Sequence, residues 1–544
     1  MIKYMFTINY NYGKKKEQYS FLKSVSREFE LENIQRYFPI LSDFLKYRNN
    51  FDKKFKILDN KYIVRRLNST LDEFDNNYEN QNKKFFGEIK NNNKKFSKIF
   101  KKDIFTKVNS ILDPMCYMMG YYSKPENIFI PTIKNKIKFD KYTFKKVNTT
   151  NNTAYIDTFS TFILSKLVEN NKTCAFPLYY NSFVGIKKNF YYNITEEYDS
   201  IKKTDWFYEG INKKKYNIHC FKKNIDLTND FEELDDYDSE EYPIVNIKCV
   251  NGDEYTNDPF VVDNNNNNLK NELDDLIDID IDSDIDNIYD SGDDYSQGSL
   301  DLNDNDYMEE YYLEMKNVPV TLTFMEAFDN TLEDLCKTDV SEDELICHLF
   351  QICFGLSIAQ KEYDFYHNDL HTANIMYNNT TDAYIYYKVQ NIYFKIPSYG
   401  KIMKIIDFGR AIFTVNSKTY FSDVFEYDGE AYGQYTYPVK DFSKKKVLPN
   451  KSFDLSRLST TLLDDIPKLN SDNTDMLNLK KLLIKWVTDK YGKDVRRYEE
   501  FDLYKIIARR MDNAIPIEQL SDDIFKKYII TKKEIPDNII IYEI

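Results

Sequence analysis

Two short segments of the chain hold the residues whose types and spacing could do chemistry. Residues 367–374 read HNDLHTAN and place Asp369 five residues before Asn374, and the tripeptide DFG follows at 407–409. An aspartate can accept the proton of an attacking hydroxyl, while an Asn and a second Asp can hold a magnesium ion against nucleotide phosphates. The spacing therefore predicts phosphoryl transfer, with Asp369 as catalytic base and Asn374 and Asp407 as ligands of Mg²⁺.

The residues that flank Asp369 suit a loop that must hold a catalytic group still. His367 can fix the loop through a backbone hydrogen bond, and Leu370 can anchor it in the core. His371 lies two residues after the predicted base, where it could meet the transferred phosphoryl group. A purely structural role is the alternative for both histidines, and it is the one we expect for His367.

The two motifs need secondary structure around them to position their side chains. Residues 319–328 predict a strand, and residues 341–362 a long buried helix that starts at an N-cap serine with a glutamate three residues on. Short apolar runs predict further strands near 374–377, 383–389, 392–396 and 401–406, and residues 452–540 are expected to be mainly helical. Upstream, strands are predicted at 127–139, 142–147 and 175–183, around a helix at 154–169.

Two other regions of the chain, residues 1–112 and 191–316, are polar and compositionally biased. Residues 1–112 predict helices joined by polar loops. Within them, 83–107 carries nine lysines, with aromatic and aliphatic residues at roughly helical spacing. We interpret it as a surface helix with a solvated lysine face. The alternative is a basic amphipathic surface for nucleic acid, a membrane or an acidic partner.

Residues 191–316 predict a polar insertion, disordered at 263–310 because so few apolar side chains cannot offset the ordering entropy.

Composition limits the class of protein. A chain of 544 residues with 42% hydrophobic content can bury a large core, and more than one compact unit is expected. The segment 263–310 has seventeen acidic residues and one basic residue, which accounts for the whole net charge of -14. Seven scattered cysteines indicate a reducing compartment. There is no signal-peptide pattern and no apolar run long enough to span a membrane.

The motifs together resemble the protein-kinase-like superfamily over about residues 127–190 and 316–465. His367, Asp369 and Asn374 match the catalytic-loop pattern HxDxxxxN, and residues 407–409 match the metal-binding DFG. Segment 452–458 looks like the start of the helix whose aspartate, here Asp454, braces that loop. More narrowly, the helix at 154–169 paired with HNDLHTANIM resembles the kinase-like proteins of giant DNA viruses, and the Asn- and Lys-rich composition agrees with that source.

The resemblance implies an ATP site and the residues that line it. TFKKV at 143–147 resembles the strand that carries the phosphate-pairing lysine, which puts Lys145 in that role. The acidic helix partner of this lysine is missing at the family's spacing, and Glu169 is the substitute, with Asp157 as another. Residues 322–335 look like the strand, hinge and turn that hold adenine, so the remaining cofactor-binding positions are Met325, Glu326 and Phe328.

Three departures from the family's pattern leave alternatives open. No glycine occurs between 121 and 184, so the glycine-rich flap over the phosphates is missing from the expected place. The helix glutamate is displaced, and His371 stands where protein kinases usually have Lys or Ala-Arg. The form HxDLHxxN is familiar in small-molecule phosphotransferases. A catalytically weak pseudokinase that acts as a binding scaffold or virion component, and a small-molecule kinase, are therefore kept beside the first interpretation.

We accordingly predict an α+β, bilobal protein-kinase-like fold with an acidic disordered insertion. Its parts are an N-terminal helical, Lys-rich extension (1–112), a small lobe with hinge (113–335) interrupted at about 191–316, and a large lobe (336–544). The predicted function is an ATP- and Mg²⁺-dependent protein Ser/Thr kinase of viral origin. A protein substrate is expected, with a small-molecule acceptor as alternative, and nucleic acid only through 83–107. The predicted location is intracellular, in host cytoplasm or a viral particle, neither secreted nor transmembrane.

Overall fold

The computed structural model describes residues 10–12, 15–44, 56–58, 60–71, 81–91, 98–122, 130–131, 141–224, 245–246, 307–427, 429–436, 446–470 and 475–544. The chain forms two compact units. The first joins Met1–Asn217 with Tyr312–Ile544 and contains both sequence motifs, and the second is Ile218–Tyr311. No helix within the described ranges has the length and apolar content needed to cross a bilayer.

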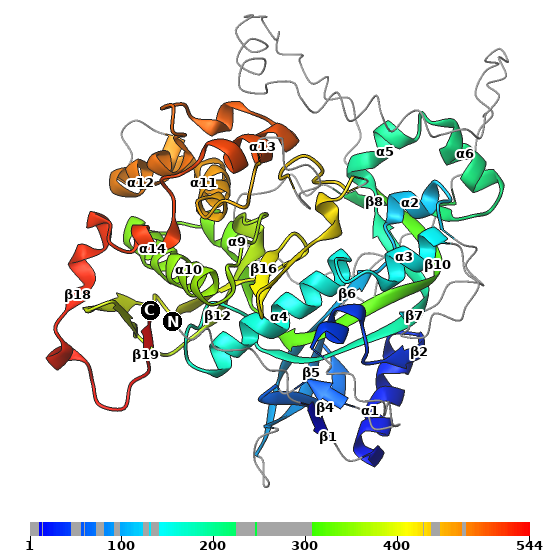
Figure 1. Ribbon diagram of the computed structural model, residues 1–544, viewed down its shortest axis with the longest axis horizontal. Helices are drawn as coiled ribbons and strands as arrows, with labels where there is room; N and C mark the ends of the chain where they lie inside the picture. The colour runs from blue at the N-terminus through cyan, green and yellow to red at the C-terminus, as the bar shows by residue number, and fades with distance from the viewer. Residues whose placement is uncertain are drawn as a thin grey trace, which may run out of the picture. The chain divides into compact units, whose positions relative to one another are not determined.

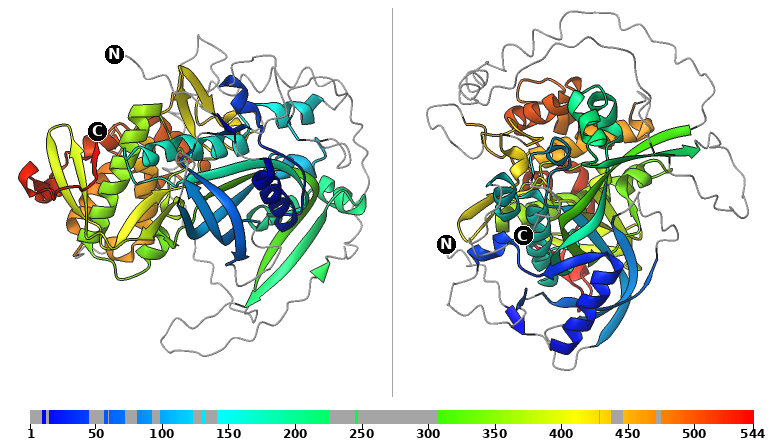
Figure 2. Two further views of the ribbon diagram at one scale, coloured as in Figure 1. Left: turned by 90° about the horizontal axis from the view of Figure 1, so that it is seen from below. Right: turned by 90° about the vertical axis from the view of Figure 1, so that its right-hand side faces the viewer.

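The main sheet of the first unit is antiparallel and curled (Figures 1 and 2). Its centre is covered on both faces, because residues 179–186 and 318–325 are buried without interruption although successive side chains of a strand point to opposite faces. Six of its strands follow one another in the order β2-β7-β10-β6-β5-β4. Their bounds are Leu31–Gln35 (β2), Tyr62–Thr70 (β4), Lys83–Asn91 (β5), Ile99–Ser110 (β6), Tyr179–Asn193 (β7) and Tyr307–Glu326 (β10).

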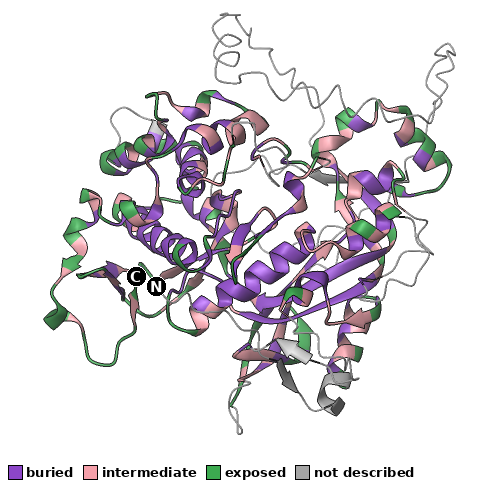
Figure 3. Ribbon diagram, in the orientation of Figure 1, coloured by how far each residue is buried: buried purple, intermediate pink, exposed green. Residues whose placement is uncertain are grey.

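One helix covers each face of this sheet. Helix α4 (Thr153–Glu169) lies on one face, where the hydroxyls of Thr158 and Thr323 are 2.9 Å apart. Helix α1 (Lys15–Glu28) lies on the other, where the rings of Phe21 and Phe324 are 5.9 Å apart. Thr323 and Phe324 are neighbours on β10, so the period of two explains why each strand residue meets only one helix. The helix predicted at 154–169 is confirmed, and Figure 3 shows α4 almost wholly buried.

The predicted helical character of residues 1–112 is wrong. Their described parts contribute β2, β4, β5 and β6 to the sheet, beside α1 and a short β1–β3 pair (Tyr10–Tyr12, Lys56–Leu58). The lysine-rich stretch 83–107 is not an amphipathic helix either, because β5 and β6 pair antiparallel across it. Phe85 and Ile89, and likewise Ile104 and Val108, are buried at even spacings along their strands. Dense Lys and Asn between them obscured the alternation.

A second correction concerns residues 142–147, which were expected to form a strand. They lie in helix α3 (Lys141–Asn148), where Thr143 and Val147 are the buried pair one turn apart. The strand predicted at 127–139 falls almost entirely outside the described residues. A short helix, α2 (Pro114–Met118), follows β6 and is capped by the side chain of Asp113.

The predicted polar insertion begins later than expected. Residues 191–217, expected to belong to the insertion, instead complete β7 and form α5 (Thr195–Ile201) and α6 (Asp205–Asn212). In the second unit, β8 (Asn217–Asn224) pairs with β9 (Val245–Asn246). Most of the acidic stretch 263–310 lies outside the described residues, and β10 begins at Tyr307.

The remaining part of the first unit is arranged around helix α10 (Glu342–Tyr363), as the sequence predicted. Its central Phe350 packs against Tyr387, Phe394 and Phe525 at ring distances of 5.0–5.2 Å. Two small sheets flank it, in the orders β11-β12-β15 and β18-β14-β13-β19. Their strands are Asn330–Thr331 (β11), Ile375–Asn379 (β12), Tyr384–Val389 (β13), Ile392–Pro397 (β14), Lys401–Ile405 (β15), Ile529–Ile530 (β18) and Ile541–Glu543 (β19).

The other elements of this part are mainly helical, which agrees with the expectation for 452–540. The hairpin β16–β17 (Ile412–Val415, Lys418–Phe421) follows the DFG tripeptide. The helices are α9 (Leu332–Cys336), α11 (Phe453–Asp465), α12 (Leu477–Val487), α13 (Glu500–Arg510) and α14 (Pro516–Gln519). The α+β class is thus confirmed, whereas the finer bilobal kinase assignment stays a prediction.

The N-terminus of α10 gives a stability prediction. Glu344 lies 3.4 Å from His348 and 2.9 Å from Lys401, and its pKa is lowered to about 2 by the hydrogen bond from His348 and the Lys401 contact. A carboxyl whose folded pKa is depressed stabilises the fold above its unfolded pKa and loses that contribution as the pH falls toward the folded value. We expect Glu344→Gln to cost on the order of 2 kcal/mol at pH 7 and almost nothing at pH 2.

Chemical denaturation followed by the fluorescence of the buried Trp486 would measure this difference at several pH values. Glu333→Gln is the control, because Glu333 pairs with Lys337 on an exposed helix face, where such pairs contribute only about 0.3–0.5 kcal/mol. An equal loss for both variants, or a loss that is independent of pH, contradicts the prediction.

Candidate active site

The loop that carries the predicted base is tied down by one buried carboxylate. Asp454, in the first turn of α11, accepts hydrogen bonds from the backbone N–H groups of His367 (3.0 Å) and Asn368 (2.9 Å). Burial raises the pKa of Asp454, and these bonds act against that rise by favouring its charged form. The bracing contact predicted for Asp454 is therefore present.

His367 joins this loop to the second motif. Its Nε2 donates to the carbonyl of Ile406, 2.8 Å away, and its Nδ1 accepts from the backbone N–H of Asp369 at 3.3 Å. The carbonyl can only accept, so the neutral ring must carry its proton on Nε2. His367 and Leu370 are both fully buried. The structural role predicted for both residues agrees with this geometry, which fixes Asp369 relative to the end of β15.

Asn374 is oriented by contacts on its amide nitrogen. Nδ2 donates to the backbone carbonyl of Asp369 (3.0 Å) and lies 2.9 Å from Nε2 of His371. Burial lowers the pKa of His371, so at neutral pH the ring is neutral and Nε2 can accept. These two contacts leave the oxygen Oδ1 for another ligand. A hard oxygen donor presented in this way fits Mg²⁺.

Asp407 occupies a strained position directly after β15 and Ile406. Its φ is +60°, in the left-handed region that non-glycine residues rarely adopt outside functional sites. The next residue, Phe408, is buried against the rings of Phe365 (5.9 Å) and His367 (5.6 Å). The backbone N–H of Phe408 donates to Asp157 of α4 at 2.8 Å. The tripeptide is thus anchored on both sides, and the Asp407 carboxylate remains partly exposed.

Lys107 of β6 lies between the carboxylates of Asp157 and Asp407. Its ammonium is 3.1 Å from Asp157 and 3.0 Å from Asp407. Burial alone would raise the pKa of Asp407, but the positive charge of Lys107 lowers it below its usual value. A strand lysine paired with an acidic residue of the adjoining helix is the arrangement that protein kinases need for holding nucleotide phosphates. Sequence reasoning missed Lys107.

The residues predicted for this role are elsewhere. Lys145 is on α3, not on a strand; its side chain is 74% exposed, and its ammonium lies 3.9 Å from the Glu426 carboxylate. Glu169, at the other end of α4, binds Lys166 (2.7 Å) and the backbone N–H of Lys61 (2.8 Å). The pairing of Lys145 with Glu169 is therefore wrong. Asp157, considered as the alternative partner, is the acidic residue that the fold places beside the lysine.

The predicted adenine-binding segment lies at the end of β10. Met325 and Phe328 are buried. The Glu326 carboxylate binds Lys404 (3.2 Å) and Asn378 (2.9 Å), and its backbone N–H donates to the carbonyl of Leu178 (2.9 Å). Glu326 thus joins β10 to β12 and β15 through its carboxylate, and its backbone N–H is already hydrogen-bonded. The contact of Glu326 with the cofactor stays a prediction.

The order of strands also moves the place where a phosphate-covering flap belongs. Strands β4 and β5 precede β6, which carries Lys107, so in the strand order of the resembled family the residues between β4 and β5 would correspond to that flap. Residues 71–82, which span the connection, contain no glycine. The missing flap predicted for 121–184 was thus sought in the wrong segment, although the glycines are absent from this one as well.

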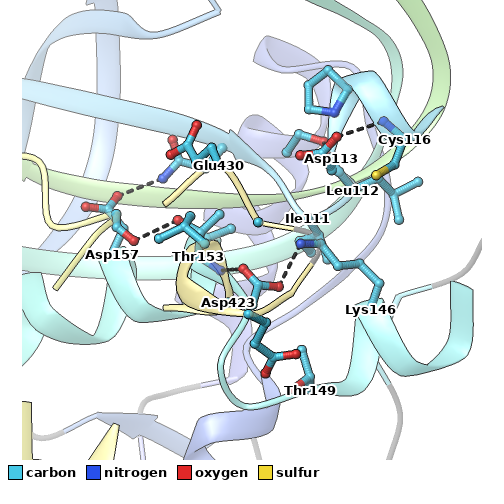
Figure 4. A pocket seen from close by; sticks show the side chains of 18 of the residues that line it. Ile111, Leu112, Asp113, Cys116, Lys146, Thr149, Thr153, Asp157, Asp423 and Glu430 are labelled. Atoms are coloured by element: carbon cyan, nitrogen blue, oxygen red, sulfur yellow. Dashed lines mark hydrogen bonds and ion pairs between the residues drawn. The ribbon is translucent and has the colours of Figure 1, made fainter. Parts of the chain in front are cut away.

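A cavity of about 600 Å³ adjoins this cluster, because Lys107, Asp157 and Asp407 line it together with residues of α3 and of the segments 423–427 and 429–430 (Figure 4). Asp423 is central to its wall. Its carboxylate binds Lys146 of α3 at 2.6 Å and the backbone N–H of Thr153, at the start of α4, at 3.0 Å. The Thr153 hydroxyl in turn donates to the carbonyl of Gly409 (2.8 Å). These contacts fix the segment after DFG against the helix that carries Asp157, and no sequence pattern indicated Asp423.

Comparison with known proteins gives one partial similarity. No protein-family model matches the chain. A protein described as "Serine/threonine-protein kinase haspin homolog" from Drosophila melanogaster is 30% identical over 136 residues, which is 23% of this chain and 24% of that protein. The chain thus spans about a quarter of that relative's length. The similarity supports a protein-kinase-like relationship and leaves the activity to be proposed.

Proposed function

We propose that the chain is an ATP- and Mg²⁺-dependent phosphotransferase that phosphorylates Ser or Thr residues of proteins. The observation that carries this proposal is the convergence of Lys107, Asp157 and Asp407 in one ion-paired cluster. His367 connects the cluster to the loop of Asp369 through its bonds to Ile406 and to the Asp369 backbone. Structural ion pairs alone do not need a strained Asp407 or an oriented Asn374.

The residues have separate roles in this proposal. Asp369 orients the acceptor hydroxyl and takes its proton, and Lys107 pairs with the nucleotide phosphates while Asp157 holds its ammonium in place. Asn374 and Asp407 would hold the metal, which when bound neutralises the charge of the phosphates. Met325 and Phe328 are the proposed contacts of the adenine ring. The proposal includes the bilobal kinase-like fold that the motifs predict.

The acceptor class rests on other observations. A protein Ser/Thr acceptor is favoured by the similarity to the Drosophila protein, which is described as a serine/threonine-protein kinase haspin homolog. His371, next to Asn374 in the HxDLHxxN pattern, favours a small-molecule acceptor as the second candidate. Origin in a large DNA virus stays a proposal based on the sequence resemblance alone.

Calorimetric titration tests the nucleotide site directly. Mg²⁺ and ATP titrated into the full chain should bind, and Asp407→Ala should lose the metal-dependent part of the binding. Asp103→Ala on β6 is a matched control, since Asp103 is exposed on the same strand as Lys107. Absence of binding to the unaltered chain would contradict the proposal and favour a pseudokinase scaffold. Transfer of labelled phosphate to a mixture of proteins, compared with a panel of sugars and amines, then separates the two acceptor classes.

A further inference from the structure

A tyrosine from a distant helix contacts the predicted base. Tyr504 lies on α13 and its hydroxyl donates to Oδ1 of Asp369 at 2.6 Å. The two residues are 135 positions apart, so the contact depends on how the fold brings α13 to the loop. Burial raises the pKa of Tyr504, and the nearby Asp369 charge adds to that rise, so the hydroxyl keeps its proton and can donate.

The Tyr504 ring is held on several sides. The guanidinium of Arg410 lies 5.3 Å from the ring centroid and that of Arg457 lies 5.1 Å from it. The buried ring of Phe453 is 6.1 Å away. Cations over an aromatic face and a neighbouring ring both favour one orientation. Tyr504 is therefore a fixed donor rather than a surface residue that meets Asp369 by chance.

The two oxygens of Asp369 have different surroundings. Oδ1 accepts the short hydrogen bond from Tyr504, whereas Oδ2 has Arg410 Nε at 3.8 Å, beyond hydrogen-bonding distance. With Oδ1 held, the carboxylate cannot rotate freely about its Cβ–Cγ bond. Oδ2 is then the oxygen that can reach an acceptor hydroxyl within the 2.6–3.2 Å range that general-base catalysis requires.

We propose that Tyr504 is a positioning residue for Asp369. Its hydroxyl fixes one carboxylate oxygen so that the other receives the proton of the acceptor. This inference rests on the proposed phosphotransferase function and deepens it by naming which oxygen acts. The hydroxyl itself does not react, so removing it should slow transfer without changing the affinity for the nucleotide.

The test compares Tyr504→Phe with the unaltered chain in the transfer of labelled phosphate from Mg·ATP to a degenerate Ser/Thr peptide mixture. We expect kcat to fall about tenfold, the size of one lost hydrogen bond to a charged group, while KM for ATP and the melting temperature stay unchanged. In the Asp369→Asn background the same substitution should have no further effect, because residues that act as one unit are not additive. Tyr491→Phe, at an exposed position of the same region, is the control and should behave like the unaltered chain.

The outcomes separate this inference from the proposed function. An unaltered chain that transfers no phosphate overturns both. An active chain with unchanged kcat in Tyr504→Phe overturns the positioning role alone, as does an additive effect in the Asp369→Asn background. Mass spectrometry after incubation with Mg·ATP gives a further check, because phosphate found on Tyr504 makes it an acceptor rather than a positioning residue.

Discussion

Asp369→Asn is expected to lower phosphoryl transfer by about 10²–10⁴-fold and to leave the affinity for Mg·ATP close to that of the unaltered chain. The amide keeps the size of the side chain and can still accept from Tyr504, but it cannot take a proton at neutral pH. Radiolabelled transfer measures the first effect and calorimetric titration the second. Equal transfer by the two proteins would remove Asp369 from the role of base.

Asn368→Ala is a useful comparison for this variant. Asn368 is fully buried and accepts from the hydroxyl of Tyr435 at 2.7 Å, so its loss should lower stability without removing the base. A thermal melt beside each transfer assay then distinguishes an unfolded protein from one that is folded but inactive. If both variants lose activity only in proportion to their loss of folded protein, the catalytic assignment is wrong.

Lys107→Met should have the second large effect, because Lys107 contacts both Asp157 and Asp407. Transfer should fall by about 10²-fold or more, since the phosphates lose their cation. The fold should also lose about 3 kcal/mol, because the Asp157 side chain, only 3% exposed, is left without its counter-charge. Initial rates at saturating ATP and denaturant unfolding measure the two effects separately.

The matched control is Lys145→Met, the same substitution at the lysine that the sequence pattern favoured. Lys145 is largely exposed and its ion pair with Glu426 is long, so neither rate nor stability should change measurably. The opposite ranking, with Lys145→Met inactive and Lys107→Met active, would restore the assignment made from the sequence. Assays below the melting temperature of Lys107→Met keep its stability loss out of the comparison.

The catalytic loop and the DFG tripeptide could be predicted because each is one continuous segment. Asp369 and Asn374 are five residues apart, and their mutual geometry follows from the local chain, as does the bracing by Asp454 at the start of a clear helix. The long apolar run of α10 and its serine N-cap could be predicted for the same reason. Such features depend on local pattern more than on tertiary packing.

The lysine of the ion-paired cluster could not be found in the same way. Lys107 reaches Asp157 because β6 pairs with β10 and α4 packs across the sheet, and neither event leaves a local signal. The resemblance placed the lysine directly before the helix, whereas α2 and α3 intervene between β6 and α4. A composition rich in Lys and Asn added many equivalent-looking lysines. The contacts of Tyr504 and Asp423 depend on tertiary structure in the same way.

The pairing of β6 with β10 also bears on how fragments of this chain behave. A truncated chain that starts at residue 113, where the motif-based boundary falls, lacks α1 and β4–β6. The backbone groups of residues 320–326 would then form an open strand edge, and Phe324 would lose the aromatic cover of α1. Unpaired edges and bare apolar faces promote aggregation. Any soluble fraction of such a fragment would also lack Lys107. A lack of activity in this fragment would therefore not count against the proposed function.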